Sequence, residues 1–168
     1  MKTVIKNLIS FILPITVLII VPFWIEKNIG LKFILTTVIG FIIIISGLFL
    51  MFRTISTFIK IGKGTLAPWS PTRKLVVAGM YKYVRNPMII GVLTVLIGES
   101  IIILSLNIFI WAVIFFIINN IFFLLYEEPD LVKKFGDEYQ EYKKNVPRRI
   151  PRWTPFMPDT EMQQKTKG

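Results

Sequence analysis

The chain has 168 residues, 54% of them hydrophobic, and a formal charge of +10. This is the length of one domain, but the hydrophobic fraction is higher than soluble domains usually carry. Cysteine and histidine are absent, which excludes disulfides and thiolate chemistry and removes the commonest general base, and we predict no metal site. Basic residues flank apolar blocks, a pattern that indicates a membrane surface and no nucleic-acid partner.

Two uncharged stretches come first, residues 8–25 and 33–52, with 18 and 20 residues. A bilayer core about 30 Å thick requires roughly 20 helical residues, so we predict that each stretch crosses the membrane. The first is longer than the apolar part of a signal peptide and has no small-residue cleavage site after it, so we expect it to be retained. Pro14 and Pro22 are expected to bend it. Residues 1–53 then form an N-terminal two-helix membrane segment.

A basic linker and a helical hairpin are predicted next. Residues 54–86 form the linker, on the cytosolic side. Residues 87–126 contain one ionisable side chain, Glu99, and are long enough for two spans. A turn at residues 105–107 divides them into arms of nearly equal length. The region 87–168 is therefore a helical hairpin followed by a C-terminal surface helix.

The placement of lysine and arginine sets the orientation of these four spans. With both termini in the cytosol, 18 of the 20 basic residues face the cytosol, and only Lys27 and Lys32 do not. The predicted fold class is an all-α integral membrane protein with about four transmembrane helices. Its predicted location is multi-pass, in the plasma membrane of a prokaryote, and the sequence predicts no oligomeric state.

Polar clusters stand at the two ends of the hairpin. A hairpin with equal arms returns to the face it left, and neighbouring helix axes lie about 8–10 Å apart. The stretch YKYVRNP at residues 81–87 is therefore expected beside the stretch LYEEPD at residues 125–130. Pro87 is expected at the first helical position with Asn86 as the N-cap, and Pro129 is expected to break the second arm.

After Pro129 we predict a C-terminal amphipathic helix on the cytosolic surface. Its apolar residues recur at intervals of three and four, which is typical of a helix with one apolar face. These residues are Leu131, Phe135, Tyr139, Tyr142 and Val146. Two roles are open: the helix only lies on the lipid headgroups, or it covers the space between the two polar clusters.

The groups gathered at this end of the hairpin match one type of small molecule. The helix start at Pro87 offers free N–H groups to an anion, and Arg85 adds a bidentate contact. Glu127 and Glu128 offer acceptors for an amine or for ribose hydroxyls, and tyrosine rings tolerate a cation. The tyrosines are Tyr81, Tyr83 and Tyr126. S-adenosylmethionine carries all the groups that these residues would bind.

Two longer motifs carry a resemblance to a known family. GMYKYVRNPMIIG at residues 79–91 and YEEPDLVKKFGDEYQEYKKNVPRRIP at residues 126–151 resemble the membrane methyltransferases of the isoprenylcysteine carboxyl methyltransferase and phospholipid methyltransferase group, as a bacterial-type member. The resemblance covers roughly residues 62–153, with a methyltransferase core at 80–152. It implies S-adenosylmethionine as cofactor and a lipophilic small molecule or lipid as acceptor.

The resemblance also implies site residues by position. Arg85, Pro87 and Gly91 match the first motif of that family, and Glu127 and Glu128 match the second. With the neighbouring polar and aromatic residues, the expected cofactor-binding set is Tyr81, Tyr83, Arg85, Asn86, Pro87, Gly91, Tyr126, Glu127 and Glu128.

Candidate catalytic residues are Glu128 and Arg148. For an amine acceptor, Glu128, a tyrosine or the substrate itself would have to serve as the base. We favour binding of anionic lipid by Arg148, Arg149 and Arg152, and the alternative for Arg148 is to hold the polar head of the acceptor. Asn86 and Ile89 stand where prenylcysteine enzymes usually have histidine and tyrosine. The acceptor therefore stays open among an isoprenylcysteine-like carboxylate, a phospholipid and another hydrophobic small molecule.

The rival interpretation is a small four-helix proton-coupled exporter. An ionisable group inside a membrane span is a functional hypothesis by default, and Glu99 is such a group. It lies far from the two polar clusters, however, and we favour a structural role for it. Replacing Glu99 by Gln would abolish export and leave methyl transfer largely intact. A third possibility is a non-catalytic membrane scaffold.

Overall fold

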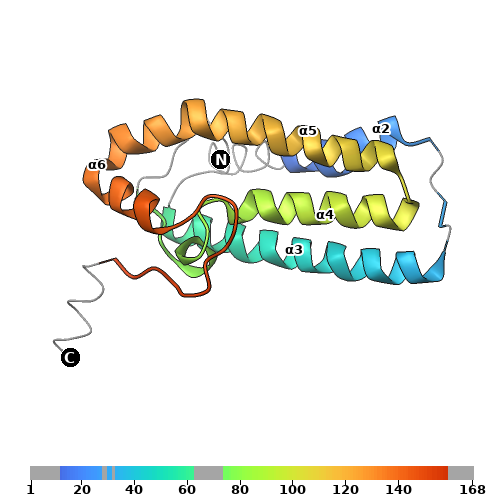
Figure 1. The fold of residues 1–168 in the computed structure, drawn as a ribbon, viewed down its shortest axis with the longest axis horizontal. Helices are drawn as coiled ribbons and strands as arrows, with labels where there is room; N and C mark the ends of the chain where they lie inside the picture. The colour runs from blue at the N-terminus through green and yellow to red at the C-terminus, as the bar shows by residue number, and fades with distance from the viewer. Residues whose placement is uncertain (1–11, 28–29, 32, 63–73, 159–168) are drawn as a thin grey trace, which may run out of the picture.

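The computed structural model describes residues 12–27, 30–31, 33–62 and 74–158, and this part of the chain contains helices and no strand (Figure 1). In chain order the elements are η1 (Thr16–Ile20), α2 (Val21–Ile25), α3 (Ile34–Gly62), η2 (Gly79–Lys82), α4 (Pro87–Ile103), α5 (Leu106–Phe122), η3 (Phe123–Glu127) and α6 (Glu128–Asn145). The elements η1 and η3 are π-helical turns, and η2 is a 3-10 helix. Figure 1 shows α4 between α3 and α5, with α6 at the end opposite the α4–α5 turn.

Two helices are long and apolar enough to cross a membrane, namely α3 and the continuous helix Leu106–Asn145. The other apolar helices, Ile12–Ile25 and Pro87–Ile103, are shorter. The all-helical prediction is confirmed for the described residues, whereas the count of four spans stays a prediction. The start of the first predicted span, residues 63–73 of the predicted linker and the C-terminal end from residue 159 lie outside the described residues.

Helix α3 continues past the predicted end of the second span at residue 52. Arg53 and Lys60 lie within the helix, and Thr54 is buried. The predicted linker at residues 54–86 therefore begins as helix. Charged residues with long side chains are good helix formers, and no proline interrupts the chain here. The change of composition at Arg53 marks the end of the apolar stretch and not the end of the helix.

Glycines bring α3 and α4 close together. Gly47 of α3 faces Gly91 of α4, and Gly40 faces Gly98 along the same antiparallel pair. A β-carbon on Gly47 would lie 2.9 Å from the Gly91 carbonyl oxygen, and one on Gly98 would lie 2.9 Å from the Gly40 carbonyl oxygen. Small residues at a helix crossing permit this approach, which is common in membrane proteins. The start of α4 is thereby fixed against a long partner helix.

The hairpin of α4 and α5 has the predicted form, with arms of 17 residues each. Its turn lies one residue earlier than predicted. Leu104 adopts the left-handed conformation with φ 53°, and Ser105 is the N-cap of α5. The Ser105 hydroxyl accepts a hydrogen bond from the Ile108 amide at 3.3 Å and donates one to the Glu26 carboxylate. A serine cap starts α5 at once, so no longer loop is required.

The prediction that Pro129 breaks the second arm is wrong. Glu128 has helical backbone angles, φ −63° and ψ −43°, and the chain passes from α5 through η3 directly into α6. The π-helical turn shifts the hydrogen-bond register just before the proline, which accommodates its missing N–H. The break lies instead at Gly136, where φ is 53° and ψ is −127°. There the helix reverses direction (Figure 1).

The break at Gly136 folds the second half of α6 back towards the start of α4. Tyr139 and Tyr142 are buried together with Val146 and Phe156 in one apolar cluster. Leu131 and Phe135, from the first half of α6, pack against the same cluster. The residues predicted to form one stripe thus gather in one place, but across a bend. This packing supports a covering role for α6 over one in which it only lies on lipid.

Candidate active site

The C-terminal strap, residues 147–152, holds the segment that precedes α4. The Arg85 amide donates to the Pro147 carbonyl at 2.9 Å, and the Arg152 amide donates to the Tyr83 carbonyl at 3.0 Å. These two hydrogen bonds fix the strap at both ends. Arg148 and Arg149 lie between these two anchor points.

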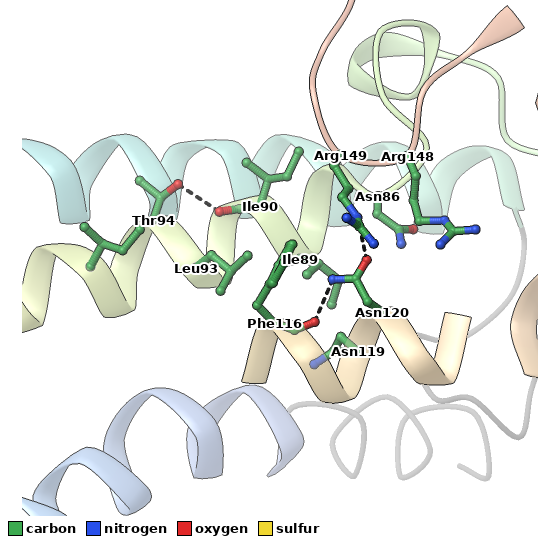
Figure 2. Close-up of a pocket in the computed structure, with 11 residues that line it drawn as sticks. Asn86, Ile89, Ile90, Leu93, Thr94, Phe116, Asn119, Asn120, Arg148 and Arg149 are labelled. Atoms are coloured by element: carbon green, nitrogen blue, oxygen red, sulfur yellow. Dashed lines mark hydrogen bonds between the residues drawn. The ribbon is translucent and has the colours of Figure 1, made fainter. Parts of the chain in front are cut away.

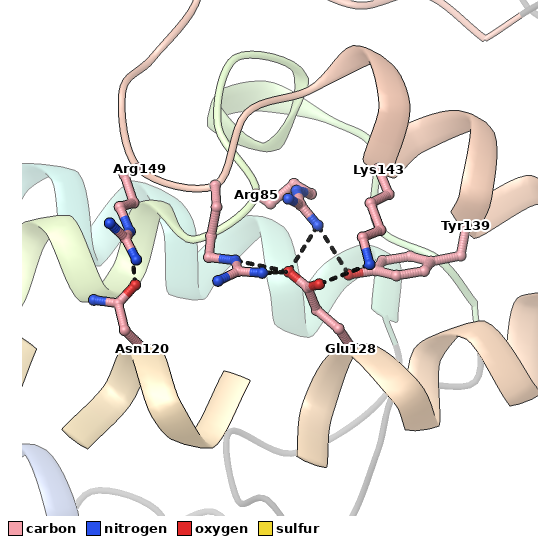
Figure 3. Close-up of polar contacts among 7 residues, drawn as sticks. Arg85, Asn120, Glu128, Tyr139, Lys143 and Arg149 are labelled. Carbon is pink, nitrogen blue, oxygen red and sulfur yellow. Dashed lines mark hydrogen bonds and ion pairs between the residues drawn. The ribbon is translucent and has the colours of Figure 1, made fainter. Parts of the chain in front are cut away.

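Glu128 lies at the centre of a buried cluster of charges (Figure 3). Its Oε1 accepts hydrogen bonds from Arg85 Nη1 at 2.8 Å and from Arg148 Nε at 2.7 Å. Lys143 Nζ lies 3.0 Å from Oε2, and the Tyr139 hydroxyl lies 3.5 Å from Arg85 Nη1. Arg85 precedes α4 and Glu128 follows α5 and η3, so these distances confirm that the two ends of the hairpin meet.

The cluster determines the protonation of Glu128. Burial by itself raises the pKa of this carboxyl, but the cations Lys143, Arg85 and Arg148 outweigh burial and lower the pKa below its ordinary value. Glu128 is only 2% exposed, so its charge depends on these partners. A carboxylate that already contacts three cations is a poor proton acceptor. The arrangement favours Glu128 as the residue that positions Arg85 and Arg148.

Glu127 lies in different surroundings, although it is the next residue in the chain. It is half-buried, and burial, followed by the nearby charge of Glu128, raises the pKa of Glu127 to about 7. Burial and then the charge of Glu127 raise the pKa of Tyr81 as well, which places these two groups near each other. Of the two adjacent acids, Glu127 is the one whose pKa permits proton exchange near neutral pH.

A cavity of about 250 Å³ lies between α4 and α5, beside the charge cluster (Figure 2). One part of its wall is apolar and runs along the hairpin. The main apolar residues are Ile89, Leu93 and Ile97 of α4 and Phe116 of α5. The polar end of the cavity is formed by Asn86, Asn119, Asn120, Arg148 and Arg149. A molecule with a hydrocarbon chain and a polar head matches this division.

The sequence analysis did not identify Asn119 or Asn120, and it considered Arg149 only as a ligand for anionic lipid. The side-chain amides of Asn119 and Asn120 donate to the carbonyls of Phe115 and Phe116, at 2.8 and 2.7 Å. Asn120 Oδ1 in turn accepts a hydrogen bond from Arg149 Nε at 2.8 Å. Adjacent amides inside an apolar span are costly in lipid unless they have a polar partner or ligand. That cost is the signal in the sequence by which this pair could have been found.

The other predicted site residues lie at different places around the cavity. Asn86 lines it and is the N-cap of α4 with Pro87 next, as predicted, although the Asn86 side chain makes no capping hydrogen bond. Tyr126 is exposed, and its ring stacks on Phe122 with 5.7 Å between centroids. Gly91 packs against α3, so it serves helix packing and does not line the cavity.

Tyr81 and Tyr83 are tied into the site through their backbones. The Tyr81 carbonyl accepts a hydrogen bond from the Tyr142 hydroxyl at 2.7 Å, and the Tyr83 carbonyl is bonded to the strap. The Tyr81 ring lies 6.4 Å from the Phe58 ring of α3. Both tyrosines therefore join the segment before α4 to its surroundings, and neither lines the cavity.

Comparison with known proteins gives this chain a family. Residues 35–138, well over half of the chain, match the family described as Phospholipid methyltransferase, and the chain belongs to that family. Over 77 residues, 46% of this chain, it is 36% identical to a Protein-S-isoprenylcysteine O-methyltransferase of Schizosaccharomyces pombe. The match covers 33% of that relative, so this chain spans about a third of its length. No solved structure matches the chain.

Proposed function

We propose that this chain transfers a methyl group from S-adenosylmethionine to a lipophilic acceptor at the cytosolic face of a membrane. The observation that carries this proposal is the composition of the α4–α5 cavity, which is apolar along the hairpin and polar beside the Glu128 cluster. Membership of the phospholipid methyltransferase family supports it. A lipophile would enter from the bilayer, and a polar cofactor would enter from the cytosol.

The polar end has the charge that S-adenosylmethionine requires. Arg85 Nε is a buried donor for which no hydrogen-bond partner is found within the described residues. Three cations surround the single carboxylate of Glu128, so the cluster has a surplus of positive charge. Such a surplus favours the carboxylate of the cofactor, whereas the half-buried Glu127 offers an acceptor for its amine or ribose.

The predicted cofactor-binding residues divide into two groups by what their side chains already contact. We expect Arg85 to contact the cofactor carboxylate through its unpartnered Nε. Asn86 lines the cavity, Tyr126 is exposed and Glu127 is half-buried, and we expect these three to contact the other groups of the cofactor. The remaining members shape the site instead, through ion pairs, helix packing or main-chain contacts. These are Glu128, Tyr81, Tyr83, Pro87 and Gly91.

The cofactor would supply an activated methyl group on a sulfonium, so the chain contributes mainly orientation and the exclusion of water. A carboxylate acceptor requires no base. An amine acceptor must first lose a proton, and the pKa of about 7 suits Glu127 to accept it. Glu128, with its lowered pKa, is less suited to that task than the sequence alone indicates.

The proposal includes the location and topology of the chain. Four spans with both termini in the cytosol place the start of α4 and the strap on the same, cytosolic side. This is the side on which a soluble cofactor is available. A prokaryotic plasma membrane is the membrane that we infer for it.

A methyl-transfer assay tests the proposal. Membranes that contain the full chain are incubated with methyl-labelled S-adenosylmethionine, and the label in the lipid extract is measured and identified by mass spectrometry. We expect transfer above empty membranes, and a loss of about tenfold or more with Asn86→Ala or Glu127→Ala, the size expected for lost polar contacts to a charged ligand. Absence of transfer, together with no calorimetric binding of S-adenosylhomocysteine to folded protein, would contradict the proposal.

The exporter interpretation is not favoured. Glu99 has a buried Oε2 for which the described residues offer no hydrogen-bond partner, but the side chain does not line the cavity. The family match also points to methyltransferases. Glu99→Gln is the matched control in the same assay, and we expect it to retain methyl transfer within about twofold, as for a residue outside the site. Loss of transfer in this variant would show that Glu99 contributes to methyl transfer and would contradict its purely structural role.

A further inference from the structure

Arg149 is held at the polar end of the cavity by two contacts from α5 (Figures 2 and 3). Its Nε donates to Asn120 Oδ1 at 2.8 Å, and its guanidinium carbon lies 5.3 Å from the centroid of the Phe116 ring. Asn120 and Phe116 are four residues apart and therefore lie on one face of the helix. Two contacts of this kind fix both the position and the plane of the guanidinium.

The two terminal nitrogens of Arg149 remain available. Within the described part of the chain, Arg149 forms no ion pair, and its hydrogen bond to Asn120 uses Nε alone. Arg148, the preceding residue, is bound differently: its Nε and Nη2 lie 2.7 and 2.6 Å from Glu128 Oε1. The charge of Arg148 is thus compensated by an acid, whereas that of Arg149 is met only by an amide oxygen and an aromatic ring.

We propose that Arg149 is a specificity-determining residue, which binds the anionic group of the lipophilic acceptor. This inference rests on the proposed function, because it takes the α4–α5 cavity as the acceptor site. The terminal nitrogens of a guanidinium form a planar fork that matches a carboxylate or a phosphate. Asn120 acts as a positioning residue, since it fixes the fork through Nε.

The position of Arg149 next to the apolar wall gives the anion its location in the acceptor. Ile89 and Leu93 line the cavity along α4, so a hydrocarbon chain that packs there ends at the strap. A charge at the boundary of an apolar region is costly without a counter-ion. An acceptor with an anionic head therefore gains affinity from Arg149, and one with a cationic or neutral head does not.

Binding of paired amphiphiles to the full chain in neutral detergent tests this inference, with calorimetry as the measurement. One pair is N-acetyl-S-farnesylcysteine and its carboxamide, and the other is lysophosphatidic acid and monooleoylglycerol. Each pair has the same hydrocarbon chain and differs in whether the head is an anion. The two pairs distinguish a carboxylate head from a phosphate head, because the pair with the larger gain in affinity of the anionic over the neutral member identifies the head that the site prefers.

We expect Arg149→Gln to weaken binding of the anionic member by about tenfold or more, as for the loss of a charge-assisted hydrogen bond, and to change the neutral member by less than twofold. Arg149→Lys is expected to restore part of the affinity, because the charge remains and the fork is lost. Lys144→Gln removes one positive charge from an exposed position of α6 outside the cavity. It is the matched control and is expected to leave both affinities unchanged.

Two results would overturn the inference. One is an equal loss of affinity for the anionic and neutral members in Arg149→Gln. The other is an equal effect of Lys144→Gln and Arg149→Gln, which would indicate general attraction to a basic surface. Titration with S-adenosylhomocysteine separates this test from the proposed function. If Arg149→Gln weakens binding of S-adenosylhomocysteine as much as binding of the anionic amphiphile, Arg149 contacts the cofactor and the inference fails. If the wild type binds the anionic amphiphile but not S-adenosylhomocysteine, the proposed function fails and Arg149 keeps its role as an anion-binding residue.

Discussion

Glu127 and Glu128 are neighbours in the chain, but cations surround only one of them. Arg85, Lys143 and Arg148 all contact Glu128, and its pKa is lowered, whereas burial raises the pKa of Glu127 to about 7. Two identical residue types thus receive different tasks from their environment. The π-helical turn before Glu128 and the reversal at Gly136 create this difference. Neither the π-helical turn nor the reversal can be predicted from the adjacent pair Glu127 and Glu128 alone.

The raised pKa of Glu127 predicts a pH-dependent stability. Its folded pKa of about 7 lies above the ordinary value of 4.5, so the folded state binds this proton more tightly than the unfolded state. The resulting stabilisation is complete below pH 4.5 and is lost as the pH rises through about 7. Glu127→Gln should therefore match the wild type at low pH and exceed it above neutral pH by about 1–3 kcal/mol.

Unfolding of the purified chain in detergent, followed between pH 4.5 and 8.5, measures this difference. Glu141→Gln, which neutralises an exposed acid of α6, is the control, and its difference from the wild type should not change over this pH range. The lowered pKa of Glu128 acts in the opposite direction, because its contribution is lost as the pH falls below 4.5. That loss is common to the wild type and to both variants. A constant difference between Glu127→Gln and wild type at every pH would contradict the prediction.

At the scale of elements, the backbone conformation of Gly136 determines where the side chains of the second half of α6 lie. Gly136 has φ 53° and ψ −127°, a conformation that residues with a β-carbon rarely adopt. The reversal there carries Tyr139 and Lys143 back to Glu128 and Arg85. The charge cluster therefore depends on a backbone position that is itself outside the site.

Gly136→Ala should lower the stability of the chain by about 1–3 kcal/mol, the cost of a strained backbone position. A β-carbon at Gly136 would meet no atom within 4 Å, so any loss comes from backbone strain and not from a clash. Gly30→Ala is the matched control, since that position is equally open and has no positive φ. Thermal unfolding in detergent measures both variants. Equal stability of the two would show that the reversal does not require glycine.

Sequence patterns predicted the helical hairpin well because its length and lack of charge leave few alternatives. They also predicted that Arg85 and Glu128 lie close together, since a hairpin with equal arms must return to the membrane face that it left. They failed at Pro129, because a π-helical turn can absorb a proline and its location depends on packing beyond the local sequence. They missed Asn120 and its contact with Arg149 for a related reason. A contact between α5 and the strap becomes visible only once the path of the strap after Val146 is known.

At the scale of the whole molecule, the proposed function depends on which side of the membrane the polar end faces. The chain contains no cysteine, so each introduced cysteine is a unique reporter of its own position. Asn107 lies at the α4–α5 turn, and Lys144 lies near the end of α6; both side chains are exposed. With the four proposed spans, 18 of the 20 basic residues would fall on the side of Lys144, so that side is expected to be cytosolic.

A membrane-impermeant maleimide should therefore label Asn107→Cys in intact cells, and Lys144→Cys only after the membrane is permeabilised. The reverse pattern would place the cavity's polar end outside the cell, where a cytosolic cofactor does not reach it. That result would contradict methyl transfer from S-adenosylmethionine while leaving the fold and the Arg149 contacts intact. Labelling of both positions from outside would instead contradict the hairpin as a pair of spans. The orientation of the chain therefore decides whether this fold can carry out methyl transfer, since the methyl donor is available to the charge cluster on the cytosolic side of the membrane and not on the other side.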